Sequence, residues 1–131
     1  MPAYDLATVA FAVDAPRKWV DNTCSHFAIT GVESTQRGVS RQFSFDGVLA
    51  VQLVRNLCVE MGLPVHAAVR LATAMLADPD AAASFARGVI ISLDLETLTH
   101  HVQQRLLEAV ESVPRIRRGR PPSRSGDKGG A

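Results

Sequence analysis

The residues of this 131-residue chain that are most able to do chemistry are few, and their spacing argues against catalysis. Cys24, Ser25 and His26 are contiguous, whereas catalytic triads are assembled from residues that the fold brings together. Asp94 and Glu96 lie two apart, on different faces of a helix, where a cap and a first-turn acid account for them. The sequence also has no glycine-rich phosphate loop. We therefore predict that the protein is not an enzyme and has no catalytic residues.

The histidines and cysteines do not form a metal-binding pattern. His100 and His101 would point in different directions on a helix, and no cysteine or carboxylate near them or His66 completes a tetrahedral set. Cys24 and Cys58 are the only cysteines, and two lone thiols favour a reduced, cytoplasmic protein in which they are packed. We predict no metal site, no cofactor and a cytoplasmic location.

The basic residues are concentrated at the C-terminus. Residues 1–113 contain 8 Lys and Arg against 12 Asp and Glu, whereas residues 114–131 contain six basic residues against Asp127 alone. Such a tail is expected to bind a polyanion. No apolar run approaches the roughly 20 residues that a membrane span needs, and the N-terminus does not resemble a secretion signal.

One short motif in the tail is similar to the core of an AT-hook. Glycine lets an extended backbone approach the floor of the minor groove, and the flanking arginines enter the negative potential of a narrow A·T tract. A solubilising Arg/Gly/Pro/Ser tail is the alternative. The tail residues predicted to contact DNA are Arg117, Arg118, Gly119, Arg120 and Pro121.

Two short helices near the N-terminus have the spacing of a helix-turn-helix. Apolar residues in the range 4–12 follow a helical stripe, and Asp14 and Pro16 predict a turn and the capped start of a second helix that runs to about residue 25. Such a pair of helices joined by a tight turn is a known DNA-binding motif, whose second helix meets base edges just after the turn. On that helix we predict DNA contacts by Arg17, Lys18 and Asn22.

A basic β-hairpin is predicted after these helices. Residues 27–29 have strand propensity, residues 32–38 form a polar segment bounded by glycine, and residues 39–43 alternate in polarity. Arg37 at the tip and Arg41 on the return strand would then contact the phosphate backbone.

A long helix and a second helix are predicted to follow. Ser44 or Asp46 caps the first, Gly62 ends it, and Pro64 begins the next, which stops at residues 78–80. The ordered motifs of this region are Arg41-x-Phe43-Ser44-x-Asp46-x-Val48, Leu53-x-x-x-Leu57 and Gly62-Leu63-Pro64-Val65-x-x-Ala68.

Residues 5–76 with these motifs resemble the DNA-binding domain of the MerR family. The resemblance implies a winged helix-turn-helix that binds double-stranded DNA. Where the family usually has paired tyrosines in the second helix, this chain has Trp19 followed by Asp21 and Asn22. Excisionases and recombination directionality factors share this architecture, so the fold does not choose between transcription and recombination.

Residues 78–113 do not resemble the coiled coil and ligand pocket of full-length MerR proteins, so no small-molecule effector is predicted. Residues 81–86 suggest a helical turn or two, residues 88–93 a lone strand, and Asp94 the cap of a final helix. The lone strand indicates a homodimer, because its backbone N–H and C=O groups need hydrogen bonds from a second strand. The apolar seam of the final helix fits either a dimer interface or packing on the N-terminal domain: Leu95, Leu98, Val102, Leu106, Ala109 and Val113.

The predicted fold class is mainly α: a winged helix-turn-helix with a small hairpin wing (residues 1–77), a strand and helix (78–113), and a disordered basic tail (114–131). The expected function is sequence-preferring binding of double-stranded DNA by a bacterial, nucleoid-associated transcription regulator. A recombination accessory or nucleoid architectural factor is the first alternative, and a protein-interaction module without DNA binding is the second. Clustering of Arg17, Lys18, Arg37 and Arg41 on one face would separate the two classes.

Overall fold

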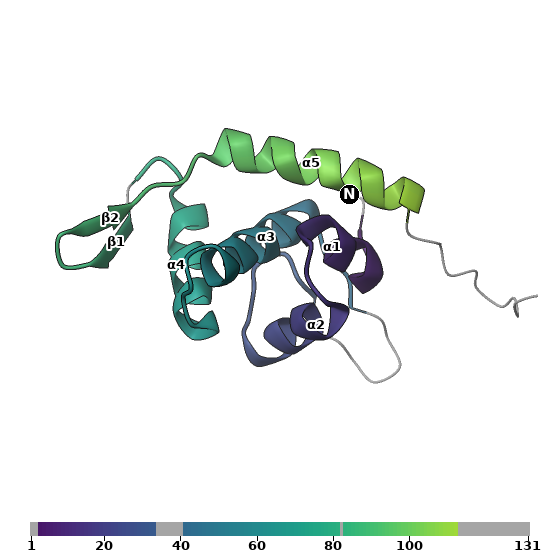
Figure 1. Ribbon diagram of the computed structural model, residues 1–131, viewed down its shortest axis with the longest axis horizontal. Coiled ribbons are helices and arrows are strands. Elements are labelled where there is room, and N and C mark those ends of the chain that lie inside the picture. Colours follow the sequence, from purple (N-terminus) through teal and green to yellow (C-terminus); the bar gives the residue numbers. More distant parts are fainter. Residues whose placement is uncertain (1–2, 34–40, 82, 113–131) are drawn as a thin grey trace, which may run out of the picture.

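The structure is a computed structural model that describes residues 3–33, 41–81 and 83–112. Its described residues are mainly helical, as predicted. The elements in order are α1 (Leu6–Val13), α2 (Arg17–His26), α3 (Phe45–Val59), α4 (Val65–Ala77), β1 (Ala83–Ala86), β2 (Val89–Ile91) and α5 (Leu95–Ser112). In Figure 1, α5 lies across α1 and α3, α2 lies on the opposite side of the body, and the β1–β2 hairpin projects beyond α4.

The turn between α1 and α2 differs in detail from the prediction. Asp5 caps α1 by accepting a hydrogen bond from the Thr8 backbone N–H at 2.8 Å. Asp14 was expected to cap the second helix, but it ends the first one, with a left-handed backbone (φ 59°) that aspartate tolerates better than most residues. Pro16 instead occupies the N-cap position of α2. Because a residue before proline avoids the helical conformation, α1 must end before Ala15.

The N-terminus of α3 is fixed by Ser44 and two glycines, which confirms Ser44 as a helix cap. The Ser44 hydroxyl accepts a hydrogen bond from the Gly47 N–H at 3.1 Å and donates one to the Gly31 carbonyl, also at 3.1 Å. Gly31 has φ 87°, and a Cβ on either glycine would overlap the backbone of the other. The predicted end of α3 is also confirmed, since Gly62 adopts φ 75° just beyond it.

The predicted strand at residues 27–29 was wrong. The last turn of α2 extends to His26, and Gly31 redirects the chain before any pairing begins. Antiparallel pairing starts at Val32, which bridges Phe43, and Phe43 also bridges Tyr4 near the N-terminus. Phe43 is fully buried, so this pairing ties three segments to the core. The hairpin tip with Arg37 lies outside the described residues.

Residues 83–86 form a strand where a helical turn was predicted. They pair antiparallel with β2, so the strand at residues 89–91 is not alone, and the argument for dimerisation from a lone strand does not hold. Gly88 (φ 81°) supplies the left-handed turn residue between the strands. Pairing with the β-branched β2 therefore overrides the helical preference of an alanine-rich segment.

The seam of α5 packs on its own chain. Leu98, Val102, Leu106 and Ala109 are buried, and α5 lies against α1 and α3. Three of them, Leu98, Val102 and Leu106, belong to the same core cluster as Val9, Val48 and other residues of the N-terminal helices. Of the two readings of this seam, packing on the N-terminal domain is confirmed for these residues. Asp94 caps α5 as predicted, accepting a bond from the Thr97 N–H at 3.1 Å.

Candidate nucleic-acid interface

The outer face of α2 carries the side chains that sequence analysis selected. Arg17, Lys18 and Asn22 are all exposed, whereas Val20 and Thr23 on the other side of the helix are buried. Lys18 and Asn22 are four residues apart and therefore lie on one stripe, which Ser25 continues. Arg17 lies beside this stripe in the first turn. The structure thus brings three predicted contact residues together on one exposed helix.

The first turn of α2 is suited to bind an anion. No side chain caps it, because Pro16 holds the N-cap position. Its first backbone N–H groups carry the positive end of the helix dipole. Arg17 and Lys18 add two full charges at the same end of this 10-residue helix. Backbone and side chains together can therefore hold a phosphate group there.

Arg41 does not lie where a phosphate contact requires it. Its side chain is only 8% exposed, and its guanidinium binds Asp21 of α2, with N–O distances of 3.3 Å from both Nε and one terminal nitrogen. The same nitrogen donates to the Ser25 hydroxyl at 3.0 Å, and the other donates to the Cys24 carbonyl at 3.5 Å. This placement opposes a direct DNA contact by Arg41 and gives it the role of an internal clamp on α2.

The clamp also changes the electrostatics of the α2 surface. Asp21 lies on the edge of the exposed face, with its side chain 49% exposed. A carboxylate there would repel a polyanion, and the adjacent guanidinium of Arg41 offsets its charge. Arg41 is buried and does not lie on the α2 surface, but its positive charge offsets that of Asp21 and so makes this surface less negative.

The contiguous Cys24, Ser25 and His26 do not form a catalytic set. Burial raises the pKa of the Cys24 thiol to about 11; Arg41 lowers this pKa by a smaller amount, and Asp21 raises it slightly. The thiol therefore carries little thiolate at neutral pH. The Ser25 hydroxyl donates to the Asp21 carbonyl at 2.8 Å, and His26 Nδ1 bonds to the Asn22 carbonyl at 2.8 Å. These side chains engage the backbone of their own helix rather than one another.

Two arginines that sequence analysis did not select hold the turn that precedes α2. Arg105 of α5 donates to the carbonyls of Phe11 and Ala12 at 2.8 and 3.2 Å, and it lies 4.8 Å from the centre of the Phe11 ring. Arg55 of α3 pairs with Asp14 at 3.6 Å and Glu60 at 3.1 Å. The contacts of Arg105 with Phe11 and Ala12 span more than 90 residues and leave no local signal in the sequence, so only the fold reveals them.

The remaining predicted contacts cannot be placed. Arg37 lies in the undescribed range 34–40, and the tail residues lie in the range 113–131. They are Arg117, Arg118, Gly119, Arg120 and Pro121. Of the four basic residues expected to share one face, the structure describes Arg17, Lys18 and Arg41. Arg17 and Lys18 are exposed in the first turn of α2, whereas the side chain of Arg41 is buried against that helix.

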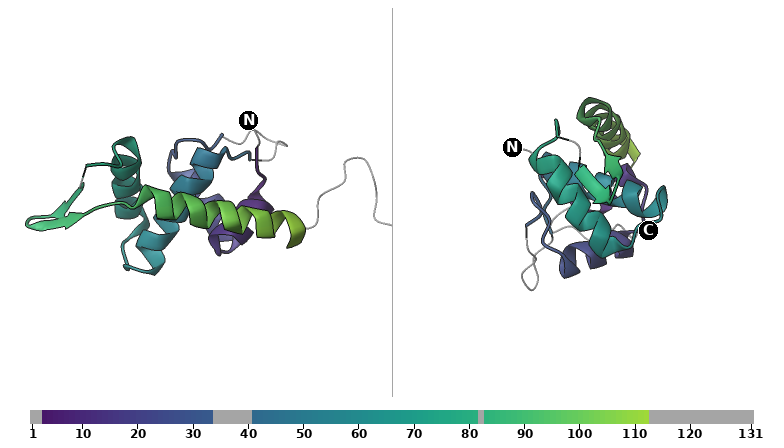
Figure 2. Two further views of the ribbon diagram at one scale, coloured as in Figure 1. Left: turned by 90° about the horizontal axis from the view of Figure 1, so that it is seen from above. Right: turned by 90° about the vertical axis from the view of Figure 1, so that its left-hand side faces the viewer.

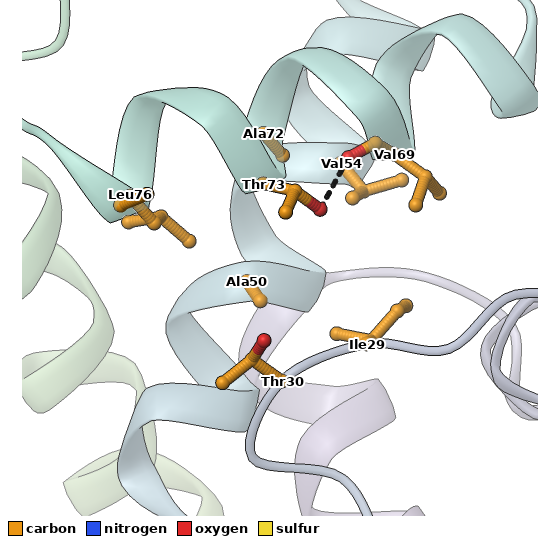
Figure 3. A pocket seen from close by; sticks show the side chains of 9 residues that line it. Ile29, Thr30, Ala50, Val54, Val69, Ala72, Thr73 and Leu76 are labelled. Atoms are coloured by element: carbon orange, nitrogen blue, oxygen red, sulfur yellow. Dashed lines mark hydrogen bonds between the residues drawn. The ribbon is translucent and has the colours of Figure 1, made fainter.

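An apolar cavity of about 280 Å³ lies between α3, α4 and residues 29–30 (Figure 3). Aliphatic side chains, among them Ile29, Val54 and Leu76, supply most of its lining. The Thr73 hydroxyl at this site donates to the Val69 carbonyl at 2.8 Å, as the dashed line shows. No charged residue lines the cavity. It therefore contributes nothing to phosphate binding.

The described residues contain no group of three His, Cys, Asp or Glu residues arranged to hold a metal ion. None of their helices combines the length and the apolar character needed to cross a bilayer.

Comparisons with protein-family models, with curated proteins and with solved structures found no match to this chain. The MerR resemblance therefore stays a prediction from the motifs quoted above.

Proposed function

We propose that the protein binds double-stranded DNA through the exposed face of α2. The observation that carries this proposal is the joint exposure of Arg17, Lys18 and Asn22 on a helix whose other side is buried. A helix that follows a tight turn, with basic side chains in its first turn and an exposed amide one turn later, has the composition of a recognition helix.

Each of these side chains has a chemical role in the proposal. Asn22 has an amide that can pair with the N6 and N7 edge of adenine, and Lys18 can donate to the O6 and N7 edge of guanine. Arg17, beside the helix N-terminus, binds a phosphate and fixes the helix on the duplex. Together they give sequence preference and register.

The segments that could not be placed have supporting roles in the proposal. Arg37 in the wing contacts phosphate, and the tail enters an A·T-rich minor groove through Arg118 and Arg120. Arg117, Gly119 and Pro121 set the course of the tail. A tail of this kind raises affinity and salt dependence while α2 supplies specificity.

The biological role that we propose is transcription regulation in a bacterium. A recombination accessory or nucleoid architectural factor would use the same α2 surface but would depend more on DNA bending than on base sequence. Comparing bend angle and sequence preference for the same duplexes separates these roles.

One observation favours a second function, that of a protein-interaction module. Residues 1–113 contain eight Lys and Arg against twelve Asp and Glu, which is unusual for a domain that holds DNA by its body alone. In this case the N-terminal helices would be a scaffold, and the tail alone would account for any DNA binding.

Fluorescence anisotropy with AT-rich and mixed-sequence duplexes across a salt series tests the proposal. The variants are Arg17→Ala with Lys18→Ala on α2, and Arg118→Ala with Arg120→Ala in the tail. Arg70→Ala is the matched control, since Arg70 is an exposed arginine of α4. If each lost phosphate contact lowers the slope of log affinity against log salt by about 0.9, either double variant lowers it by at most about 1.8.

The DNA proposal holds if the α2 double variant also loses discrimination between duplex sequences while the Arg70 variant behaves like wild type. If the tail variant abolishes all binding and the α2 variant changes nothing, the helix is not a DNA reader. The interaction-module function is then the better one.

A further inference from the structure

The β1–β2 hairpin exposes apolar side chains on a part of the molecule that projects from the helical body. Figure 1 and the left view of Figure 2 show it projecting past α4. Val89 is 47% exposed and Ile90 is 69% exposed. Because successive residues of a strand point to opposite faces, β2 exposes apolar surface on both sides. A two-stranded hairpin with strands of four and three residues is marginal on its own.

The two outer edges of this hairpin differ. The pairing shifts register between Ser84 and Ala86, so β1 contains an irregularity of the bulge type. Bulges and charged residues are common means of preventing an edge strand from pairing with another chain. The sequence of β2, Val89-Ile90-Ile91, has no charge, proline or bulge. The edge of β2 is therefore the one suited to accept a further strand.

We propose that the β2 edge pairs antiparallel with β2 of a second copy of this chain, forming a four-stranded sheet across a twofold axis. In such a pairing each residue faces the residue at the mirrored position, and Ile90 faces Ile90 of the other copy. The backbone groups on the β2 edge are then bonded, and the most exposed apolar side chain of the hairpin is covered.

Charge complementarity favours a second copy as the occupant. With Ile90 at the axis, the turn that carries Arg87 just before β2 lies at the end of the sheet where the other copy's chain leaves β2 towards Asp94. The same arrangement occurs again on the other side of the axis. Arg87 and Asp94 are both exposed in the single chain, so each is accessible to the opposite charge. β2 is thus an uncharged strand flanked by Arg87 in the turn before it and by Asp94 at the start of α5, and antiparallel self-pairing brings these opposite charges towards each other.

The interface is small, and this fixes the kind of dimer that it makes. Three residues from each strand bury far less than the roughly 1,200 Å² at the lower limit of stable interfaces. The hairpin dimer is therefore weak and dependent on protein concentration. On a duplex with two half-sites, the two α2 helices would be held together, and the weak contact becomes effectively intramolecular.

Cysteine crosslinking of the full chain without DNA tests the pairing independently of DNA binding. Ile90→Cys places two thiols opposite each other at the axis, at a spacing that a disulfide or a short bis-maleimide can join. Leu107→Cys is the matched control, because Leu107 is 62% exposed but lies on α5. Wild type measures the background from Cys24 and Cys58.

Sedimentation velocity over a concentration series gives a second measurement. Wild type is expected to move towards a dimer as concentration rises, whereas Ile90→Lys and Arg87→Glu remain monomeric and Leu107→Lys follows wild type. The Ile90 cysteine variant is expected to crosslink severalfold more than the Leu107 variant. A wild type that stays monomeric at every concentration, or equal crosslinking at the two positions, overturns the proposal. Capture of a different protein by the hairpin, without self-association, overturns it as well.

Discussion

The ion pair of Arg41 and Asp21 gives an asymmetric prediction, because the two partners differ in burial. Removing the carboxylate in Asp21→Ala leaves the guanidinium of a side chain that is 8% exposed, and its remaining partners among the described residues are the Ser25 hydroxyl and the Cys24 carbonyl. Breaking a buried ion pair costs about 3–5 kcal/mol. Since Asp21 is half exposed, we expect a smaller loss of stability, about 2–4 kcal/mol.

Arg41→Met removes the other partner and should cost less. Methionine replaces most of the buried aliphatic stem, and the half-exposed Asp21 carboxylate can be hydrated. The lost hydrogen bonds are 3.0–3.5 Å long, so we expect a cost of about 1–2 kcal/mol. The sign of the difference between the two variants is the informative quantity.

Urea unfolding followed by circular dichroism and by the fluorescence of Trp19, the single tryptophan, measures both losses. Asp21→Asn serves as a control, since it keeps an acceptor of the same size without the charge, and it should fall between wild type and Asp21→Ala. If Arg41→Met costs as much as Asp21→Ala or more, Arg41 acts mainly through packing, and the clamp argument is refuted.

Three further predictions concern other elements. Gly47→Ala should lower the free energy of unfolding by more than about 3 kcal/mol or prevent folding, because the added Cβ would overlap the Gly31 backbone. Gly62→Ala has open space around it and should cost only about 1 kcal/mol. Chemical denaturation of both variants compares the two costs. Hydrogen bonds from Thr97 lower the pKa of the Asp94 carboxyl, so its contribution to the stability of α5 is complete above the unfolded pKa of about 4 and is lost as pH falls through the lower folded value. The urea midpoint of Asp94→Asn should therefore lie below that of wild type at neutral pH and approach it in acid, and a gap independent of pH would contradict this. Leu106→Ala should cost about 2–5 kcal/mol and Leu107→Ala almost nothing, because the first is 4% exposed and the second 62%, and equal costs would mean that α5 does not pack as described.

Local chemistry in the sequence was sufficient to predict most helices and their ends. Ser44 caps the N-terminus of α3, Gly62 follows its C-terminus, and Pro64 precedes the first turn of α4. In both helices the spacing of the apolar residues matches the face that is buried. These signals act between residues a few positions apart, so they are readable without the fold. The same reasoning selected Arg17, Lys18 and Asn22 as exposed residues of α2, where the structure places them.

The errors arose where pairing or packing between two segments decides the outcome. Residues 83–86 have helical composition, but they form a strand because β2 pairs with them. The apolar seam of α5 is equally compatible with a dimer interface when the sequence is considered alone. In the structure α1 and α3 cover it.

The sequence alone therefore determined the helical class, the ends of α3 and the exposed basic start of α2, since these follow from local propensity and periodicity. Only the tertiary structure decided the role of Arg41. Its charge suggested a surface contact, yet it lies under α2 because Asp21, 20 residues away, offers it a carboxylate. A side chain's charge is written in the sequence, but its partner and its exposure depend on which segments the core brings together.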